Sequence, residues 1–169
     1  MKLNQGLVLH TSVAALLVIF GVIVKNSSEQ MKMANHPIAK PLGMGLFILG
    51  WIYTAYVLSL YKQNKLVFIV PCLAIAGSVF MMKHHMAKKE PPPMVYPIIF
   101  ILSWLALGFN VGNHLTGKMK YLGLLASVLV LISMLKLLPA QRKDCIVDGP
   151  GMPLFVIAWA IIVFLNGSR

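Results

Sequence analysis

The sequence predicts an all-α integral membrane protein, a single domain over residues 1–169, in which six transmembrane helices form three repeated helical hairpins. Its 169 residues are 59% hydrophobic and only 11% charged, whereas soluble domains carry about 25% charged residues. Six apolar segments each approach the ~20 residues that a helix needs to cross a bilayer. A tryptophan-containing stretch also occurs three times at nearly equal spacing, which indicates an internal repeat.

The expected helices follow from the apolar segments in chain order. In hydrocarbon every backbone N–H and C=O must be paired within its own segment, so each segment is predicted to be helical. The first segment resembles a signal peptide, but it lacks a convincing small-x-small cleavage site, and we interpret it as an uncleaved span. The six segments cover about residues 6–24, 42–61, 66–82, 95–114, 121–138 and 151–165.

The repeated stretch contains Phe, two branched aliphatic residues, a small residue and Trp. It uses all three tryptophans of the chain. Another aromatic residue follows each Trp five positions later. The three copies are Phe47-Ile48-Leu49-Gly50-Trp51, Phe100-Ile101-Leu102-Ser103-Trp104 and Phe155-Val156-Ile157-Ala158-Trp159.

The connections between the predicted helices alternate between long and short, with the same period as the repeat. A long basic loop that ends in prolines precedes each tryptophan helix, and a tight turn follows the first two. Proline is tolerated in the first turn of a helix, where its missing N–H costs no hydrogen bond. The repeats are therefore assigned to about residues 1–62, 63–117 and 118–169. Two arrangements satisfy this pattern: a six-helix bundle with pseudo-threefold symmetry, or a row of hairpins that pack only on their neighbours.

The repeated aromatic residues are expected to be helix-packing residues. Phe and Trp four positions apart lie on one helix face, and the small residue before Trp lets a second helix approach closely. The tryptophans fall in mid-span, not at an interface where they commonly anchor a helix. A ligand site lined by three tryptophans is the alternative, and each indole N–H is expected to donate to a neighbouring helix. The packing set is Phe47, Gly50, Trp51, Phe100, Ser103, Trp104, Phe155, Ala158 and Trp159.

Ionisable residues are almost absent from the predicted spans, which contain no Asp, Glu or Arg. Intramembrane charges usually mark transport and proton relays, so ion-coupled transport is disfavoured. No nucleophile–base pair or metal-ligand set can be named either, so we expect no enzyme, no catalytic residue, no cofactor and no metal site. Asn110, Asn113 and His114 are expected to form interhelical hydrogen bonds, or alternatively to line a polar pocket.

The chain is strongly basic, with a net charge of +11 from 15 Lys and Arg against four acids. The basic residues lie in short loops beside apolar spans, so anionic headgroups are the expected partner, together with other protein subunits, and no nucleic acid is expected. Nine basic residues in the long loops against six on the opposite side predict cytoplasmic long loops. The predicted membrane-surface or partner contacts are Lys25, Lys32, Lys40, Lys83, Lys88, Lys89, Arg142 and Lys143.

Three smaller features complete the prediction. Cys72 lies in an apolar span and Cys145 in a loop, so no disulfide is expected. Asn26 and Asn166 begin glycosylation sequons on opposite sides of the membrane, and both are expected to be unused. Pro71 is a candidate kink in the third helix.

The general character of the chain combines short basic loops, few acids, no charge within the spans and eleven methionines. In composition and layout it resembles small multi-spanning structural proteins in the internal membrane of large icosahedral DNA viruses, beneath the capsid. It is also similar to accessory subunits of organellar membrane complexes. The resemblance implies a non-enzymatic, virion or complex-associated scaffold and carries over no functional residue. A small channel or facilitator is the alternative.

Overall fold

The computed structural model gives the backbone of most of the chain. Side chains are described along most of each helix, with the exception of several helix ends at 25–30, 39–40, 81–88 and 134–140. The described residues are 3–30, 38–60, 69–88, 95–113, 115, 117–140 and 151–168.

The described part of the chain is all-helical and contains six α-helices and no strand, which confirms the predicted helical class. A short 3-10 helix, Gly117–Tyr121, precedes the fifth α-helix and begins at a glycine with a positive φ of 64°. The α-helices are α1 Gln5–Gln30, α2 Ala39–Ser59, α3 Ile69–Lys88, α4 Val95–Gly112, α5 Leu122–Ala140 and α6 Gly151–Gly167.

The predicted ends of two helices were wrong. α1 continues to Gln30, beyond the predicted end near Val24, and α3 continues to Lys88, beyond the predicted end near Met82. The added segments are polar, but Lys, Glu, Gln, Met and Ala are good helix formers. Once a helix is nucleated, such residues extend it past the end of the apolar stretch. Hydrophobicity therefore located the apolar spans but not the helix ends.

Three helices, not six, are long and apolar enough by themselves to cross a membrane within the described residues. They are Gln5–Val24 of α1, Pro41–Ser59 of α2 and Val95–Gly112 of α4. Ile69–Phe80 of α3 and Gly151–Gly167 of α6 are apolar but shorter. Within the described residues, the prediction of six individually sufficient spans is therefore corrected to three.

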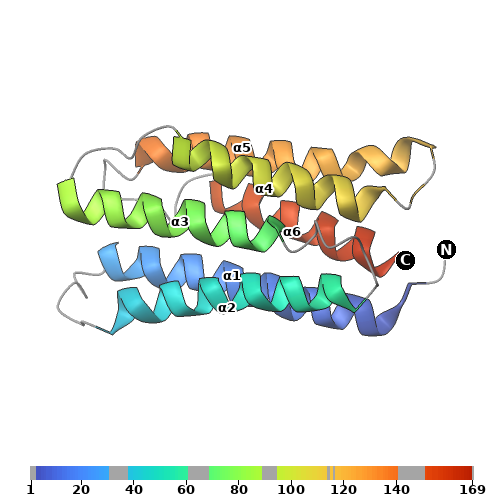
Figure 1. The fold of residues 1–169 in the computed structure, drawn as a ribbon, viewed down its shortest axis with the longest axis horizontal. Helices are drawn as coiled ribbons and strands as arrows, with labels where there is room; N and C mark the ends of the chain where they lie inside the picture. Colours follow the sequence, from blue (N-terminus) through green and yellow to red (C-terminus); the bar gives the residue numbers. More distant parts are fainter. Residues whose placement is uncertain are drawn as a thin grey trace.

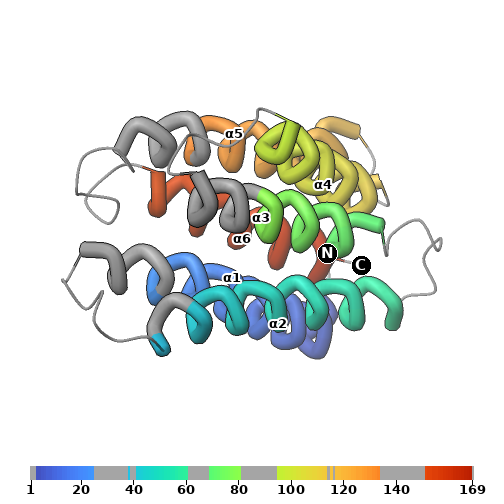
Figure 2. The backbone as a smooth tube through the Cα atoms, turned by 60° about the vertical axis from the view of Figure 1, so that its left-hand side comes forward, coloured from blue at the N-terminus to red at the C-terminus, as the bar shows by residue number. Residues whose placement is uncertain are grey.

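The six helices form a closed bundle, not a row of hairpins. Figure 1 shows consecutive helices running antiparallel along the long axis, with the N- and C-termini at the same end. Each helix packs on the next in the chain, and α6 packs back on α1, which closes the ring. α4 also contacts α6, and α2 and α3 make the least extensive of the contacts between consecutive helices. Figure 2 shows the same arrangement from the side.

Small residues set how closely the helices approach. A Cβ on Gly50 of α2 would lie only 2.7 Å from the backbone nitrogen of Val18 in α1. Gly108 of α4 and Gly123 of α5 face each other so closely that a Cβ on either would overlap the carbonyl group of the other. Backbone contact through small residues is typical of helix packing in membranes.

Large apolar side chains lie both inside and outside the bundle. One contiguous cluster of buried side chains connects all six helices. Each helix also presents large apolar side chains to the outside, for example Phe20, Ile52, Phe80, Leu102, Leu131 and Ile157. A soluble bundle would place polar residues on these outer faces, so the surface is suited to hydrocarbon.

Two predicted features fall near the described start of α3. Pro71 lies in the first turn of the described helix, which begins at Ile69. Residues 61–68, just before it, lie outside the described residues, so the kink at Pro71 stays a prediction. Cys72 is exposed and unpaired in the next position, and Cys145 lies outside the described residues.

Candidate functional site

The three repeated tryptophans meet at the centre of the bundle. Trp51, Trp104 and Trp159 come from α2, α4 and α6, and their exposed fractions are 0%, 0% and 1%. Their ring centroids are 5.1 to 5.8 Å apart, and each ring contacts both of the others. The interplanar angles of 53 to 86° are tilted or edge-to-face arrangements, which aromatic rings favour. We call this group the tryptophan layer.

The repeated phenylalanines pack against the tryptophan layer. Phe47, Phe100 and Phe155 are all buried. The Trp51 ring meets Phe100 at 6.3 Å between centroids, and the Trp104 ring meets Phe155 at 5.8 Å. Each tryptophan in these two pairs therefore contacts the phenylalanine of the following repeat, which is the relation that a pseudo-threefold axis would produce.

The small residue of each repeat is also buried but makes different contacts. Gly50 faces α1, where it lies against Ala14 and Val18. Ser103 is fully buried and donates its hydroxyl to the carbonyl of Phe100 in its own helix, at 2.6 Å. Ala158 is fully buried in the same core cluster. The structure thus brings all nine predicted packing residues to the interior.

None of the three buried indole N–H groups has a hydrogen-bond partner in the described structure. The prediction that each would donate to a carbonyl or hydroxyl of a neighbouring helix was therefore wrong. Within a helix the backbone carbonyls are occupied by the helix's own N–H groups, and the neighbouring positions in the tryptophan layer are aromatic. The layer is thus an apolar packing element with three buried donors.

A small polar cluster lies on the other side of the tryptophan layer from the phenylalanines. Asn166 of α6 donates to the hydroxyl of Thr11 in α1 at 2.7 Å, and Thr11 donates to the carbonyl of Leu7 at 2.7 Å. Thr54 of α2 donates to the carbonyl of Gly50 at 2.8 Å. These three polar side chains border an interior cavity of about 10 Å³ that is otherwise lined by apolar residues. Such a volume is about enough for one water molecule.

The polar cluster also bears on the sequon at Asn166. Its side chain is 1% exposed and is engaged with Thr11. Buried in this way, the side-chain amide is inaccessible to a glycosylating enzyme. Asn26, which begins the other sequon, lies in α1, where its side chain is not described.

The polar residues predicted at the end of α4 are described only in part, because His114 lies outside the described residues. Asn110 donates to the carbonyl of Ala106 in its own helix at 2.8 Å, and Asn113 is exposed. A contact not predicted from the sequence joins His10 of α1 to the hydroxyl of Tyr53 in α2, at 2.7 Å.

The basic residues predicted to contact headgroups or partners are all beyond the described side chains. Lys25, Lys40, Lys83 and Lys88 fall within the helical backbones of α1, α2 and α3. The remaining four, Lys32, Lys89, Arg142 and Lys143, lie outside the described residues. On the opposite side, near the termini, the exposed Lys120 lies 5.0 Å from the ring centroid of its neighbour Tyr121.

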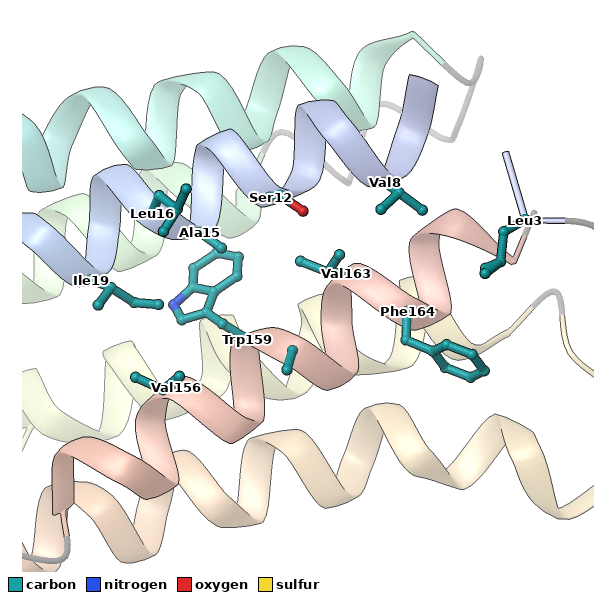
Figure 3. A pocket seen from close by; sticks show the side chains of 11 residues that line it. Leu3, Val8, Ser12, Ala15, Leu16, Ile19, Val156, Trp159, Val163 and Phe164 are labelled. Atoms are coloured by element: carbon teal, nitrogen blue, oxygen red, sulfur yellow. The ribbon is translucent and has the colours of Figure 1, made fainter. Parts of the chain in front are cut away.

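A surface groove runs along the contact between α1 and α6. Its volume is about 450 Å³. Figure 3 shows Leu3 and Phe164 at one end, and Ile19 and Val156 at the other. The Trp159 ring reaches from α6 toward α1 between these ends, so one ring of the tryptophan layer also borders the groove.

The described residues contain no group of three or more His, Cys, Asp or Glu side chains that could hold a metal ion. What the described geometry provides is a packed aromatic centre, a buried polar cluster and an apolar groove. No family model matches the chain, and no curated protein or solved structure is significantly similar to it.

Proposed function

We propose that the protein is a multi-spanning structural or assembly protein of a membrane, in which all six helices cross the bilayer. In this proposal it is a scaffold within a larger complex, such as a virion inner membrane beneath a capsid. It performs no chemistry itself. Its bundle packs within lipid, and its basic loops contact anionic headgroups or the surfaces of other subunits.

The antiparallel bundle supports six crossings. α1, α2 and α4 each have the length and composition of a span. α3, α5 and α6 contain 20, 19 and 17 residues and lie alongside these helices in the closed ring. At 1.5 Å per residue, 17 residues extend about 26 Å, close to the ~30 Å hydrocarbon thickness. Helices of this length cannot leave the bilayer while they pack side by side with helices that cross it.

The outer surface supports the same location. Large apolar residues are exposed on every helix, and exposed apolar surface on this scale is costly in water. In a bilayer the same residues contact acyl chains at no such cost. The helix-forming polar segments at the ends of α1 and α3 then extend toward the headgroups, and anionic lipid is the partner that the sequence predicts for their lysines.

The observation that carries the scaffold proposal is the tryptophan layer. Trp51, Trp104 and Trp159 fill the central axis at mid-span, and each is almost completely buried. An aqueous channel through one bundle would need an open, hydrated path at this depth. The packed rings favour a solid helical scaffold over the alternative of a channel or facilitator.

A liposome flux assay tests the proposal. The purified protein is reconstituted at known orientation and density, and conductance of small ions and uptake of neutral solutes are measured against empty vesicles. We expect no flux above the empty vesicles. Reproducible flux that is lost on Trp104→Ala or Asn110→Leu would overturn the scaffold proposal in favour of a channel.

The six crossings have their own test. Single cysteines are placed at each helix end in a Cys72→Ala, Cys145→Ser background, and their labelling by a membrane-impermeant maleimide is compared before and after permeabilisation. We expect residues at the long-loop ends and residues near the termini to label from opposite sides. Labelling of both ends of α3, α5 or α6 from one side would contradict a six-span arrangement.

A further inference from the structure

We propose that the groove between α1 and α6 binds a single lipid acyl chain, which lies along the bundle and contacts Trp159. This inference rests on the proposed membrane location but goes beyond it. It assigns one defined lipid-binding site to the bundle, whereas the rest of the outer surface is expected to contact lipid without a defined site. We call the site the α1–α6 groove, lined chiefly by Val8, Ser12, Ile19, Val156, Trp159 and Val163.

The groove is built from one continuous face of each helix. On α1 its lining includes Val8, Ser12, Ala15 and Ile19, which recur at intervals of three or four residues. Residues at this spacing stack on one side of a helix. Figure 3 shows this face turned toward the corresponding face of α6, where Trp159 is the largest lining residue. Two facing rows of this kind form a straight groove, not a rounded pocket.

The dimensions of the groove match an extended hydrocarbon chain. From Val8 to Ile19, a helical rise of about 1.5 Å per residue gives a length of about 16 Å. The hydrocarbon depth of one leaflet is about 15 Å, half of the ~30 Å core. The groove runs from the terminal side of the bundle to the mid-span tryptophan layer, so it covers the depth that one chain of that leaflet occupies.

The same dimensions favour a hydrocarbon chain over a helix of a partner protein as the occupant of the groove. A volume of about 450 Å³ spread over about 16 Å leaves a cross-section of roughly 28 Å². An α-helix about 10 Å in diameter needs roughly 80 Å². A second copy of the chain would present helices of this width, so it could cover the groove but not fill it.

The chemistry of the lining favours hydrocarbon over a headgroup or a polar ligand. Among the lining residues, the only polar side-chain groups are the Ser12 hydroxyl and the Trp159 indole N–H. No charged side chain lines the groove. Its open side is continuous with exposed apolar residues such as Leu16 and Phe164, which face the surrounding lipid in the proposed orientation.

The repeat places a different residue beside the groove than at the other two helix contacts. The residue four positions after each tryptophan is Ala55, Gly108 or Val163. In α4 this residue is Gly108, whose backbone touches Gly123 of α5. In α6 it is Val163, a β-branched residue that lines the groove. The contact between α2 and α3, where the residue is Ala55, is the least extensive of the three, so the size of this residue alone does not set how closely the helices approach.

The tryptophans allow a direct test by short-range quenching. Three variants each retain one tryptophan and carry phenylalanine at the other two positions. They are reconstituted in vesicles of phosphatidylcholine brominated in mid-chain, and their fluorescence is compared with that in unbrominated vesicles. We expect the variant that retains Trp159 to lose a larger fraction of its fluorescence than the other two, because its ring is the one that borders the groove. The three rings are 5.1 to 5.8 Å apart, so the variants that retain Trp51 or Trp104 should be quenched less, but not spared.

A groove-filling variant provides a second measurement that keeps all three tryptophans. Ser12→Leu with Ala160→Leu adds bulk where the side chains are not fully buried, so the core stays intact. We expect its total quenching in brominated vesicles to fall below that of the natural chain. Ala76→Leu, on α3 and away from the groove, is the matched control and should leave the quenching unchanged. Equal quenching of the groove-filling variant and the natural chain would overturn the proposal.

An outward-facing tryptophan separates failure of this inference from failure of the proposed function. Leu102→Trp is introduced on the exposed face of α4 in a chain whose three natural tryptophans are phenylalanine. Strong quenching there, with no quenching of Trp159, would show a bundle in lipid with no chain in the groove. No quenching at position 102 would instead contradict the membrane location. Weak quenching of Trp159 in vesicles where crosslinking shows the natural chain to be dimeric would assign the groove to a second copy and overturn the acyl-chain proposal.

Discussion

Two contacts between helices involve equivalent positions of the repeat but differ in how they are filled. We call the contact between α4 and α5 the closed seam and the contact between α1 and α6 the open seam. In the closed seam, between α4 and α5 around Gly108 and Gly123, the two backbones touch. The Ser127 hydroxyl of α5 also donates to the carbonyl of Trp104 in α4 at 2.8 Å. In the open seam, between α1 and α6 around Ala15 and Val163, an apolar groove runs along the contact.

The open seam is held mainly at its end near the chain termini. There Asn166 donates to Thr11 across 2.7 Å, and the backbone N–H of Asn4 donates to the carbonyl of Gly167 at 2.7 Å. Both seams contain a glycine in close contact, since a Cβ on Gly167 of α6 would overlap the side chain of Val8 in α1, as one on Gly108 would overlap Gly123. The two seams differ because only the open seam has an apolar groove beside this contact.

Of the changes at the seams, the largest effect is expected in the closed seam. Gly108→Val places a side chain where the Gly123 carbonyl lies, and neither backbone can yield without moving a whole helix. Overpacking of this kind costs about 3 kcal/mol. We expect a loss of this size in the free energy of unfolding, measured by titration with a denaturing detergent. The groove and its lipid contact should be altered less than the α4–α5 contact.

The control for this change is a glycine with free space beside it. A Cβ on Gly45 of α2 would meet no atom within 4 Å. Since valine also has a higher helix propensity than glycine, Gly45→Val should change the free energy of unfolding by less than about 0.5 kcal/mol. Equal losses for the two variants would show that the closed seam does not depend on backbone contact.

An intermediate effect is expected where polar residues hold the open seam. Thr11→Val removes the acceptor of Asn166 and leaves that buried amide without its partner, which costs about 1–2 kcal/mol. Asn166→Leu removes the amide itself, and the Thr11 hydroxyl keeps its bond to the carbonyl of Leu7. We therefore expect Asn166→Leu to cost less than Thr11→Val in the same unfolding titration.

The order of these two variants is the informative result. A larger loss for Asn166→Leu than for Thr11→Val would mean that Asn166 makes further bonds that stabilise the seam. Its carbonyl oxygen lines the interior cavity without a partner in the described structure, so a bridging water there would act in this direction.

Much of the fold could be predicted because each helix carries its own signal. Apolar stretches of nearly bilayer length located six helices, and the recurrence of Phe and Trp picked out residues that meet at the centre. No residue pattern within a single helix predicts that the ring closes. Closure depends on α1 meeting α6, and the bond between Thr11 and Asn166 joins residues 155 positions apart. Single Thr and Asn residues are common in apolar helices, so the sequence around each of the two does not predict which residue it bonds.

The open seam was missed for a different reason. The change from Gly108 to Val163 at the position four after Trp is visible in the sequence, but its meaning depends on which helix faces it. The unpaired indoles were also missed, since the usual pairing of a buried indole with an acceptor does not hold where its neighbours are other aromatic rings. These features depend on packing between repeats, which composition and periodicity within one repeat do not describe.

The smallest expected effect concerns the tryptophan layer, which both seams share. Trp51→Phe removes an indole N–H that is buried without a partner, and relief of that penalty is worth about 1–3 kcal/mol. It also removes part of a ring that contacts Trp104 and Trp159, which costs a similar amount through lost packing. The two terms oppose each other, so we expect a net change below about 1 kcal/mol in the free energy of unfolding.

Alanine at the same position sets the scale for this comparison, because Trp51→Ala should cost about 4 kcal/mol through the cavity it leaves. If phenylalanine costs nearly as much as alanine, the indole N–H must be bonded in the bilayer, and the layer would be a polar site. If the same small change is found at Trp51, Trp104 and Trp159, the three rings act as equivalent packing residues. The difference between the closed and open seams would then arise outside the shared layer, in the residues that line each seam.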